Sequence, residues 1–156
     1  MTTFKINDDY MTPFEAWEDI AHLIPRRVIW EPFYGDGESG DYLRSLGFEV
    51  IHEDVDFFDH DLGEIIVTNP PFSITKTIIP RLKQLNKPFI MIMPSSKICT
   101  NYVRESFKDC LQIIIPRKRI NFIKHENGEE VESQGSPFEC FYYCFRIGLP
   151  RDIVFL

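Results

Sequence analysis

The chain has 156 residues, of which 44% are hydrophobic, and a net charge of −7. That length supports a real hydrophobic core, and without an obvious internal repeat we expect one domain over residues 1–156. No run approaches the roughly 20 apolar residues of a membrane span, and the N-terminus has no signal-peptide pattern. The four cysteines show no C-x-x-C pairing, and Cys140 and Cys144 lie at even spacing on an apolar strand pattern, which predicts that they are buried. The four scattered histidines form no metal-ligand cluster. We therefore expect a cytoplasmic protein with reduced thiols and no metal, in the host cytoplasm if it is viral.

The predicted elements alternate between helices and strands along the chain. A helix over residues 14–23 starts the series, with Thr12 as its cap, Pro13 at its first position and Pro25 at its end. After it we expect strand 28–30, helix 41–46, strand 48–52, an acidic connection 54–61, strand 65–68, helix 74–85 bent or interrupted at Pro80, strand 89–93, helix 100–109 and strand 111–115. Residues 119–124 and 138–147 are typical of two strands around a turn. Together these elements predict an α/β sheet covered on both faces, with a C-terminal antiparallel strand pair.

Charge is divided unevenly between two halves of the chain. Residues 1–65 hold 16 acids and 4 bases, a net of −12, whereas residues 66–156 hold 8 acids and 13 bases, a net of +5. An acidic half joined to a basic half suits an enzyme that modifies a polyanion. The alternative is a chance partition of a solvated surface.

The stretch Thr68-Asn69-Pro70-Pro71-Phe72 directly follows the apolar run Ile65-Ile66-Val67. Two prolines fix two φ angles and remove two backbone donors, so the strand must end here in a stiff loop. The loop presents the Asn69 side chain, bare carbonyl oxygens and the face of Phe72. That set suits an exocyclic amine on a planar ring, which offers two N–H bonds and a stacking surface. The alternative is a plain strand exit with Phe72 in the core.

A second loop, Glu31-Pro32-Phe33-Tyr34-Gly35-Asp36-Gly37, lies between a predicted strand and a predicted helix. Its glycines allow the backbone to approach a ligand beyond the carboxyl ends of the strands. The flanking acids oppose a pyrophosphate and suit a cationic ligand. S-adenosylmethionine is one, because it carries a sulfonium and an ammonium and no phosphate. The alternative is a tight turn with surface acids.

Asn69-Pro70-Pro71-Phe72 resembles the catalytic motif of the S-adenosylmethionine-dependent amino-methyltransferases. Followed by Ser73, it is most similar to bacterial and phage-type N6-adenine DNA methyltransferases. The second loop resembles their first motif, and residues 117–122, Gly128 and Ser136-Pro137-Phe138 resemble their C-terminal segment. The likeness runs from about Tyr10 to Ile147 and implies a Rossmann-like class I methyltransferase sheet. Motifs of this kind also occur in RNA-adenine enzymes and in a glutamine-modifying branch.

The resemblance implies a site for S-adenosylmethionine. Glu31 would contact its methionine end, and Asp54, or Glu53 instead, would bind the ribose hydroxyls. The implied cofactor-binding residues are Met11, Thr12, Pro13, Glu31, Pro32, Gly35, Gly37, Asp54, Asp56, Phe57 and Asn69. The chain departs from the family here, because the second strand runs into residues 54–61 with no room for the usual helix.

The resemblance also implies the chemistry and its target. Asn69 and the Pro70 carbonyl would accept the N–H bonds of a flipped-out adenine, Pro71 would stiffen the loop, and Phe72 would stack on the base. The implied nucleic-acid-binding residues are Ser73, Arg117, Lys118, Arg119 and Lys124. No stretch is long enough for a separate target-recognition domain. This leaves weak specificity, a single-stranded target, or a homodimer or recognition partner as alternatives.

Two other functions compete with DNA adenine methylation. An RNA N6-adenine methyltransferase would suit a short recognition surface and a single-stranded target. A catalytically degenerate methyltransferase-like module, binding nucleic acid or a partner, would explain the compressed middle of the chain.

Overall fold

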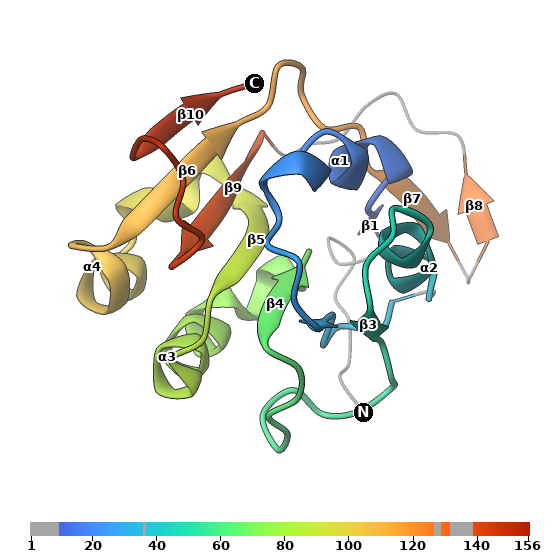
Figure 1. Cartoon of the computed structure of the whole chain (residues 1–156), viewed down its shortest axis with the longest axis horizontal. Coiled ribbons are helices and arrows are strands. Elements are labelled where there is room, and N and C mark those ends of the chain that lie inside the picture. The colour runs from blue at the N-terminus through green and yellow to red at the C-terminus, as the bar shows by residue number, and fades with distance from the viewer. Residues whose placement is uncertain (1–9, 36, 127–128, 132–138) are drawn as a thin grey trace.

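The structure, a computed structural model, describes residues 10–35, 37–126, 129–131 and 139–156. Within them lie a seven-stranded sheet and a separate three-stranded sheet (Figure 1). Asp36, Gly128 and the Ser136-Pro137-Phe138 segment, which the sequence analysis singled out, lie outside the described residues.

The main sheet places the two predicted ligand loops side by side. Its strand order is β10-β6-β9-β5-β4-β2-β3, and β9 alone runs antiparallel to its neighbours. The strands are β2 (Ile29–Trp30), β3 (Val50–Ile51), β4 (Ile65–Thr68), β5 (Phe89–Pro94), β6 (Leu111–Ile115), β9 (Cys140–Phe145) and β10 (Ile153–Phe155). Because β2 pairs in parallel with β4, the loops that follow these two strands leave the same edge of the sheet.

Helices cover both faces of this sheet. They are α1 (Phe14–Glu18), η2 (Ala21–Leu23), α2 (Glu38–Ser45), η3 (Phe72–Ile74), α3 (Thr75–Leu85), η4 (Ser95–Cys99) and α4 (Asn101–Phe107). Strand residues alternate between two hydrophobic cores: Ile65 and Val67 join the core that includes α1 and α2, and Ile66 joins the core that includes α3 and α4 (Figure 1). The predicted Rossmann-like α/β fold is therefore confirmed.

Two details of the helices differ from the sequence expectation. Pro13 is the N-cap residue of α1 and no side chain caps this helix, so the prediction that Thr12 caps it is wrong; Thr12 is buried instead. α3 continues through Pro80, which is exposed. The missing N–H costs the helix one hydrogen bond, and the buried side chains of Ile78, Ile79 and Leu82 hold it against the sheet.

Helix α2 starts three residues before the predicted start, at Glu38. Its N-cap is Gly37, whose φ of 85° is in the left-handed region that glycine adopts without strain. The glycine loop therefore leads directly into the first turn of α2.

The C-terminal strands pair differently from the prediction. An antiparallel pair is present, but it consists of β7 (Ile123–Glu126) and β8 (Glu129–Val131), with β1 (Tyr10–Met11) on the other side of β7. β9 instead enters the main sheet between β5 and β6. The reason is burial on both faces: Tyr142 and Cys144 face one core, and Tyr143 and Phe145 face the other. β10 was not predicted.

Burial of Cys140 and Cys144, predicted from their place on an apolar strand, is confirmed. Across the described residues, no helix combines the length and apolar character needed to cross a membrane. Nor does that part of the chain gather three or more potential metal ligands from His, Cys, Asp and Glu side chains.

Candidate functional site

A buried carboxyl joins the two loops at the edge of the sheet. Glu31, which follows β2, is 1% exposed, and its Oε1 accepts the Phe33 N–H at 3.0 Å. The hydroxyl of Thr68, the last residue of β4, donates to the same oxygen, and the Asn69 backbone N–H also hydrogen-bonds to this carboxyl. Glu31 thereby fixes the glycine loop to the loop that carries Asn69.

Burial dominates the electrostatics of Glu31. It raises the pKa of the carboxyl from 4.5 to about 8, although the hydrogen bonds from Thr68, Phe33 and Asn69 act in the opposite direction. The group is consequently neutral at pH 7 in the free protein. A cation brought against it would favour the ionised form, so this position suits an ammonium ligand.

Asn69 carries an acceptor without a partner. Its Oδ1 is buried and makes no hydrogen bond, whereas the backbone N–H of the same residue is engaged with Glu31. Leaving a buried acceptor unpaired costs about 1–3 kcal/mol, so such atoms in native proteins call for a reason. Pro70 and Pro71, both buried, follow directly and hold the loop stiff. The arrangement keeps an amide oxygen ready for a donor supplied by a ligand.

Phe72 packs against the protein in this structure. It is 8% exposed, and its ring meets that of Phe122 edge to face, with centroids 6.2 Å apart and an interplanar angle of 82°. The Thr75 hydroxyl donates to the Phe72 carbonyl at 3.3 Å and also lies 3.0 Å from the Tyr102 hydroxyl. Stacking of Phe72 on a base stays a prediction.

Met11, one of the predicted N-terminal cofactor residues, lies against the glycine loop. Gly35 has a φ of +60°, and a Cβ built on it would lie 3.1 Å from Met11 Sδ, so Met11 lies against this loop. Thr12 is buried, Pro13 is half-buried and Pro32 is buried. Met11 and Gly35, which are more than 20 residues apart in the sequence, therefore lie close together, as residues that bind one ligand must.

The three predicted residues after β3 differ in exposure. Asp54 is exposed, as is the alternative Glu53. Asp56 is exposed too, and its carboxylate accepts the Phe58 N–H at 2.9 Å. Phe57 is buried, with its ring centroid 5.1 Å from that of Phe33 in the glycine loop. Ligand contacts of these side chains stay predictions.

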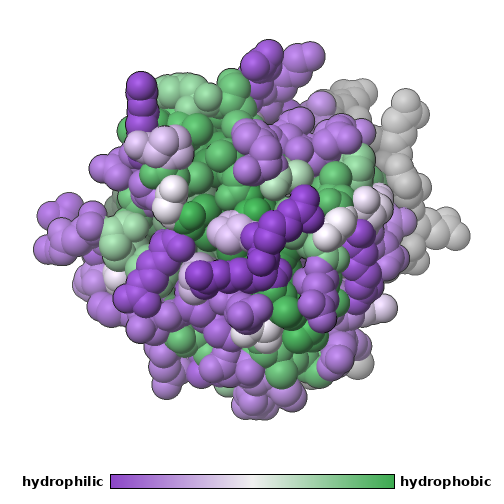
Figure 2. All heavy atoms as spheres, viewed as in Figure 1, coloured by the Kyte–Doolittle hydropathy of each residue, from purple (hydrophilic) through white to green (hydrophobic). Residues whose placement is uncertain are grey.

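The predicted nucleic-acid-binding residues fall into three places. Arg117, Lys118 and Arg119 are exposed and line a cavity of about 810 Å³ beside α1, together with the acids Glu15 and Asp19, so the charge of the cavity is mixed. Figure 2 shows an apolar area at the upper left of the molecule, where Figure 1 draws β10 and the C-terminus. Ser73 is exposed on η3, and Lys124 lies on β7 opposite Tyr10.

Two residues of this region were not singled out from the sequence. Thr68 ends an otherwise apolar strand, and a polar residue at the last position of a buried strand is the signal that could have identified it. His52, after β3, is 7% exposed and contacts both the glycine loop and α2. Nothing in its local sequence indicates those contacts.

Comparison with known proteins identifies the fold. No protein-family model and no curated protein matches the sequence. Among solved structures, a putative RNA methyltransferase from Pyrococcus horikoshii superposes with a TM-score of 0.52 at 15% identity, over 92% of this chain and 89% of that one. A putative class I S-adenosylmethionine-dependent methyltransferase from Listeria monocytogenes superposes with a TM-score of 0.51 at 12% identity, over 98% and 67%. The fold is that of class I methyltransferases.

A third similar structure is TehB from Haemophilus influenzae, with a TM-score of 0.49 and 15% identity. The alignment covers 85% of this chain and 61% of TehB, so the chain spans less than two thirds of that protein.

Proposed function

We propose that this protein is an S-adenosylmethionine-dependent methyltransferase that acts on the N6 amine of adenine in DNA. The observation that carries the proposal is the buried, unpaired Oδ1 of Asn69, one residue beyond Thr68 at the carboxyl end of β4. The backbone N–H of Asn69 hydrogen-bonds to the buried Glu31. The methyltransferase fold supports the reaction class. The choice of adenine N6 rests on the resemblance of residues 69–73 to that family's motif.

The residues present fit S-adenosylmethionine. Glu31 offers a buried carboxyl for the ammonium group, and Gly35 and Gly37 keep the backbone free of side chains where the loop would pass the ligand. The side chain of Met11 lies next to Gly35. When bound, the cofactor supplies a methyl group activated by the positive sulfur. Thr12, Pro13, Pro32, Asp54, Asp56 and Phe57 complete the proposed binding set.

Asn69 would contribute to catalysis by orienting the N6 amine of adenine. The N6 lone pair of adenine is delocalised into the ring and is a poor nucleophile, so acceptors must draw its N–H bonds away from the ring plane. Asn69 Oδ1 takes one N–H and the Pro70 carbonyl takes the other. The nitrogen would take the methyl group that the cofactor supplies as the methyl–sulfur bond breaks, S-adenosylhomocysteine would leave, and the nitrogen would then release a proton to solvent. No titrating base is needed before transfer.

The proposed substrate is a base that has left the duplex stack, or one in single-stranded DNA. The exposed Arg117, Lys118 and Arg119 would contact its phosphates, together with Ser73, which directly follows the catalytic motif, and Lys124 of β7. We propose that residues 1–156 work as one catalytic domain and that target choice is weak or supplied by a second copy or a partner. In support, one seven-stranded sheet takes in most of the described strands.

RNA adenine is the second candidate. The similar structure from Pyrococcus horikoshii is described as a putative RNA methyltransferase, and the alignment covers 89% of it, so that protein is comparable in size to this chain. A degenerate binding module is the third alternative, and intact cofactor binding with methyl transfer would exclude it.

The test is methyl transfer from labelled S-adenosylmethionine to matched DNA and RNA, single- and double-stranded, with the products digested and identified by mass spectrometry. We expect N6-methyldeoxyadenosine. Asn69→Ala should reduce transfer by roughly 100-fold or more while binding S-adenosylhomocysteine normally. Gln84→Ala is the matched control, because it removes an exposed amide near the far end of α3.

Each other result has a definite meaning. Activity that survives in Asn69→Ala would refute the assignment of the amine acceptor. Methylated ribonucleoside alone would move the protein to the RNA branch. Absence of both transfer and cofactor binding would favour the degenerate module.

A further inference from the structure

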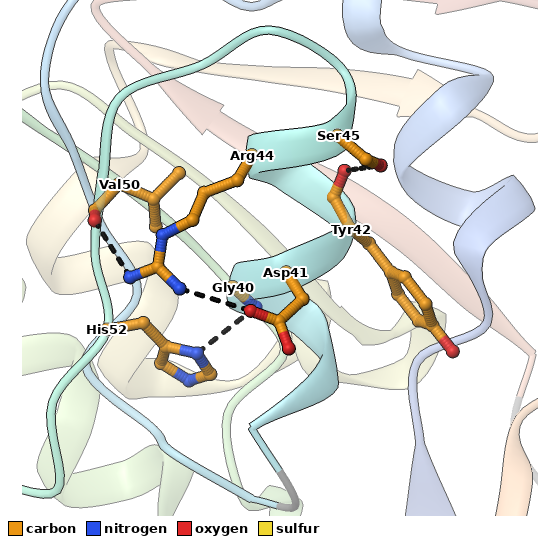
Figure 3. A network of polar contacts seen from close by, with 7 residues as sticks. All are labelled: Gly40, Asp41, Tyr42, Arg44, Ser45, Val50 and His52. Atoms are coloured by element: carbon orange, nitrogen blue, oxygen red, sulfur yellow. Dashed lines mark hydrogen bonds and ion pairs between the residues drawn. The ribbon is translucent and has the colours of Figure 1, made fainter.

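His52 lies at the junction of three elements around the glycine loop. It follows β3 and is buried, and its Nδ1 lies 3.1 Å from the Gly40 N–H in the first turn of α2 (Figure 3). Its Nε2 lies 3.4 Å from the Phe33 carbonyl, and its ring centroid lies 4.8 Å from that of Tyr34. One imidazole therefore contacts the start of the glycine loop and the helix that follows the loop.

The contacts define which form of the imidazole is present. Nδ1 accepts the Gly40 N–H, so the proton of the neutral ring is on Nε2, from which it can donate to the Phe33 carbonyl. The Gly40 N–H is one of the first-turn donors that have no partner within a helix. His52 supplies that partner from a different strand.

The imidazole of His52 lies very close to the backbone of Gly40. A Cβ built on Gly40 would lie 2.1 Å from His52 Nδ1 and 2.6 Å from its Cβ, so only glycine permits this approach. The separation between α2 and the end of β3 is thereby set by direct contact. Since the glycine loop spans from β2 to α2, its conformation depends on the same contact.

We propose that His52 is a positioning residue for cofactor binding: its neutral imidazole holds Phe33 and Tyr34 of the glycine loop against the first turn of α2 in the arrangement that receives S-adenosylmethionine. This rests on the proposed function. The residue acts through the loop and α2 and touches neither reacting atom. Glu53 and Asp54, the two candidates for the ribose hydroxyls, follow it directly in the chain, so their placement depends on His52 as well.

Burial and neighbouring groups together determine the pKa of His52. Burial is the largest cause and lowers the pKa of His52, and Arg44 of α2 lowers it further. Asp41 of α2 (Figure 3) and the backbone of Phe33 and Tyr34 act in the opposite direction. Protonation would place an N–H on Nδ1 facing the Gly40 N–H, and two donors cannot hydrogen-bond. Cofactor affinity should therefore weaken in acid through His52.

The test measures the affinity for S-adenosylhomocysteine by titration calorimetry from about pH 5 to pH 8, with thermal melting at each pH to verify folding. His52→Asn retains an amide oxygen near the position of Nδ1 and does not titrate. His52→Phe retains the ring and removes both nitrogens. His22→Asn is the control, because it removes an exposed histidine of η2.

At about pH 7.5, His52→Phe should bind roughly tenfold more weakly than the unmodified protein, and His52→Asn within about threefold of it. Glu31 also titrates in this range, but it does so in every variant. The difference between the pH profiles of the unmodified protein and His52→Asn therefore isolates His52. We expect the unmodified protein to lose an additional several-fold in acid, and His22→Asn to follow it.

Two results would overturn the proposal while leaving the proposed function intact: unchanged affinity in folded His52→Phe, or superimposable profiles for the unmodified protein and His52→Asn. A merely structural histidine would give either one, with a change in melting temperature alone. If the unmodified protein bound no S-adenosylhomocysteine at any pH, both the proposed function and this role would be refuted.

Discussion

Glu31→Gln provides a direct test of the buried carboxyl that joins the two loops. Glutamine has nearly the shape of the neutral carboxyl, and its Oε1 can still accept the hydrogen bonds from Phe33 and Thr68. It cannot ionise. The variant therefore separates the pH-dependent contribution of Glu31 to stability from its packing.

The sign follows from the pKa of Glu31, which burial raises to about 8 in the native state from 4.5. Between these values the native protein binds a proton that the unfolded chain has lost, so the free energy of unfolding falls as the pH rises. The stabilisation is complete below pH 4.5 and disappears as the pH rises through about 8. Each pH unit inside this window changes stability by about 1.4 kcal/mol, or about 3 kcal/mol between roughly pH 5.5 and 7.5.

The assay is urea unfolding of the free protein and of Glu31→Gln across that range. All other side chains are the same in both proteins, so the readout is the difference between them. We expect Glu31→Gln to gain about 3 kcal/mol relative to the unmodified protein from the acidic to the basic end. Saturating S-adenosylhomocysteine should reduce this gain, because its ammonium favours the ionised carboxylate. A difference that does not change with pH would refute the inference that Glu31 is buried and neutral.

Thr68→Val removes the hydroxyl that donates to Glu31 and should weaken binding of S-adenosylhomocysteine by roughly fivefold to tenfold, whereas Thr68→Ser should restore it. Equal calorimetric affinities for the two variants would exclude this hydrogen bond as a determinant. Phe72→Ala should lower the free energy of unfolding by about 3 kcal/mol because it removes the packing on Phe122, and should also slow transfer to single-stranded DNA. Phe155→Ala, at an exposed position, is the stability control; normal single-turnover transfer by folded Phe72→Ala would restrict Phe72 to the core.

Several features of the fold could be predicted from the local sequence pattern alone. β4 has the predicted bounds, because an apolar run that meets two prolines can neither continue as a strand nor begin a helix at once. Burial of Cys140 and Cys144 followed from their even spacing on an apolar strand. The α/β class followed from the alternation of helical and strand periods. All of these depend on residues close together in the chain.

Strand pairing in the C-terminal part was beyond such patterns. Residues 138–147 have the composition of a strand, but nothing local indicates that β9 lies between β5 and β6. A strand can pair wherever both of its faces become buried, and that depends on the whole sheet. The prediction paired strands that are adjacent in the sequence, whereas β9 pairs with β5 and β6, where both of its faces are buried.

The sequence by itself determined which residue types stand at the ends of the strands: an acid before glycines after β2, and an amide before two prolines after β4. Only the tertiary structure decided that Glu31 accepts a hydrogen bond from Thr68, 37 positions away, and that the Asn69 oxygen is left without a partner. It also decided that His52 contacts Gly40. Such contacts depend on the parallel pairing of β2 with β3 and β4, which brings distant backbone segments within hydrogen-bond distance. No local propensity encodes that separation.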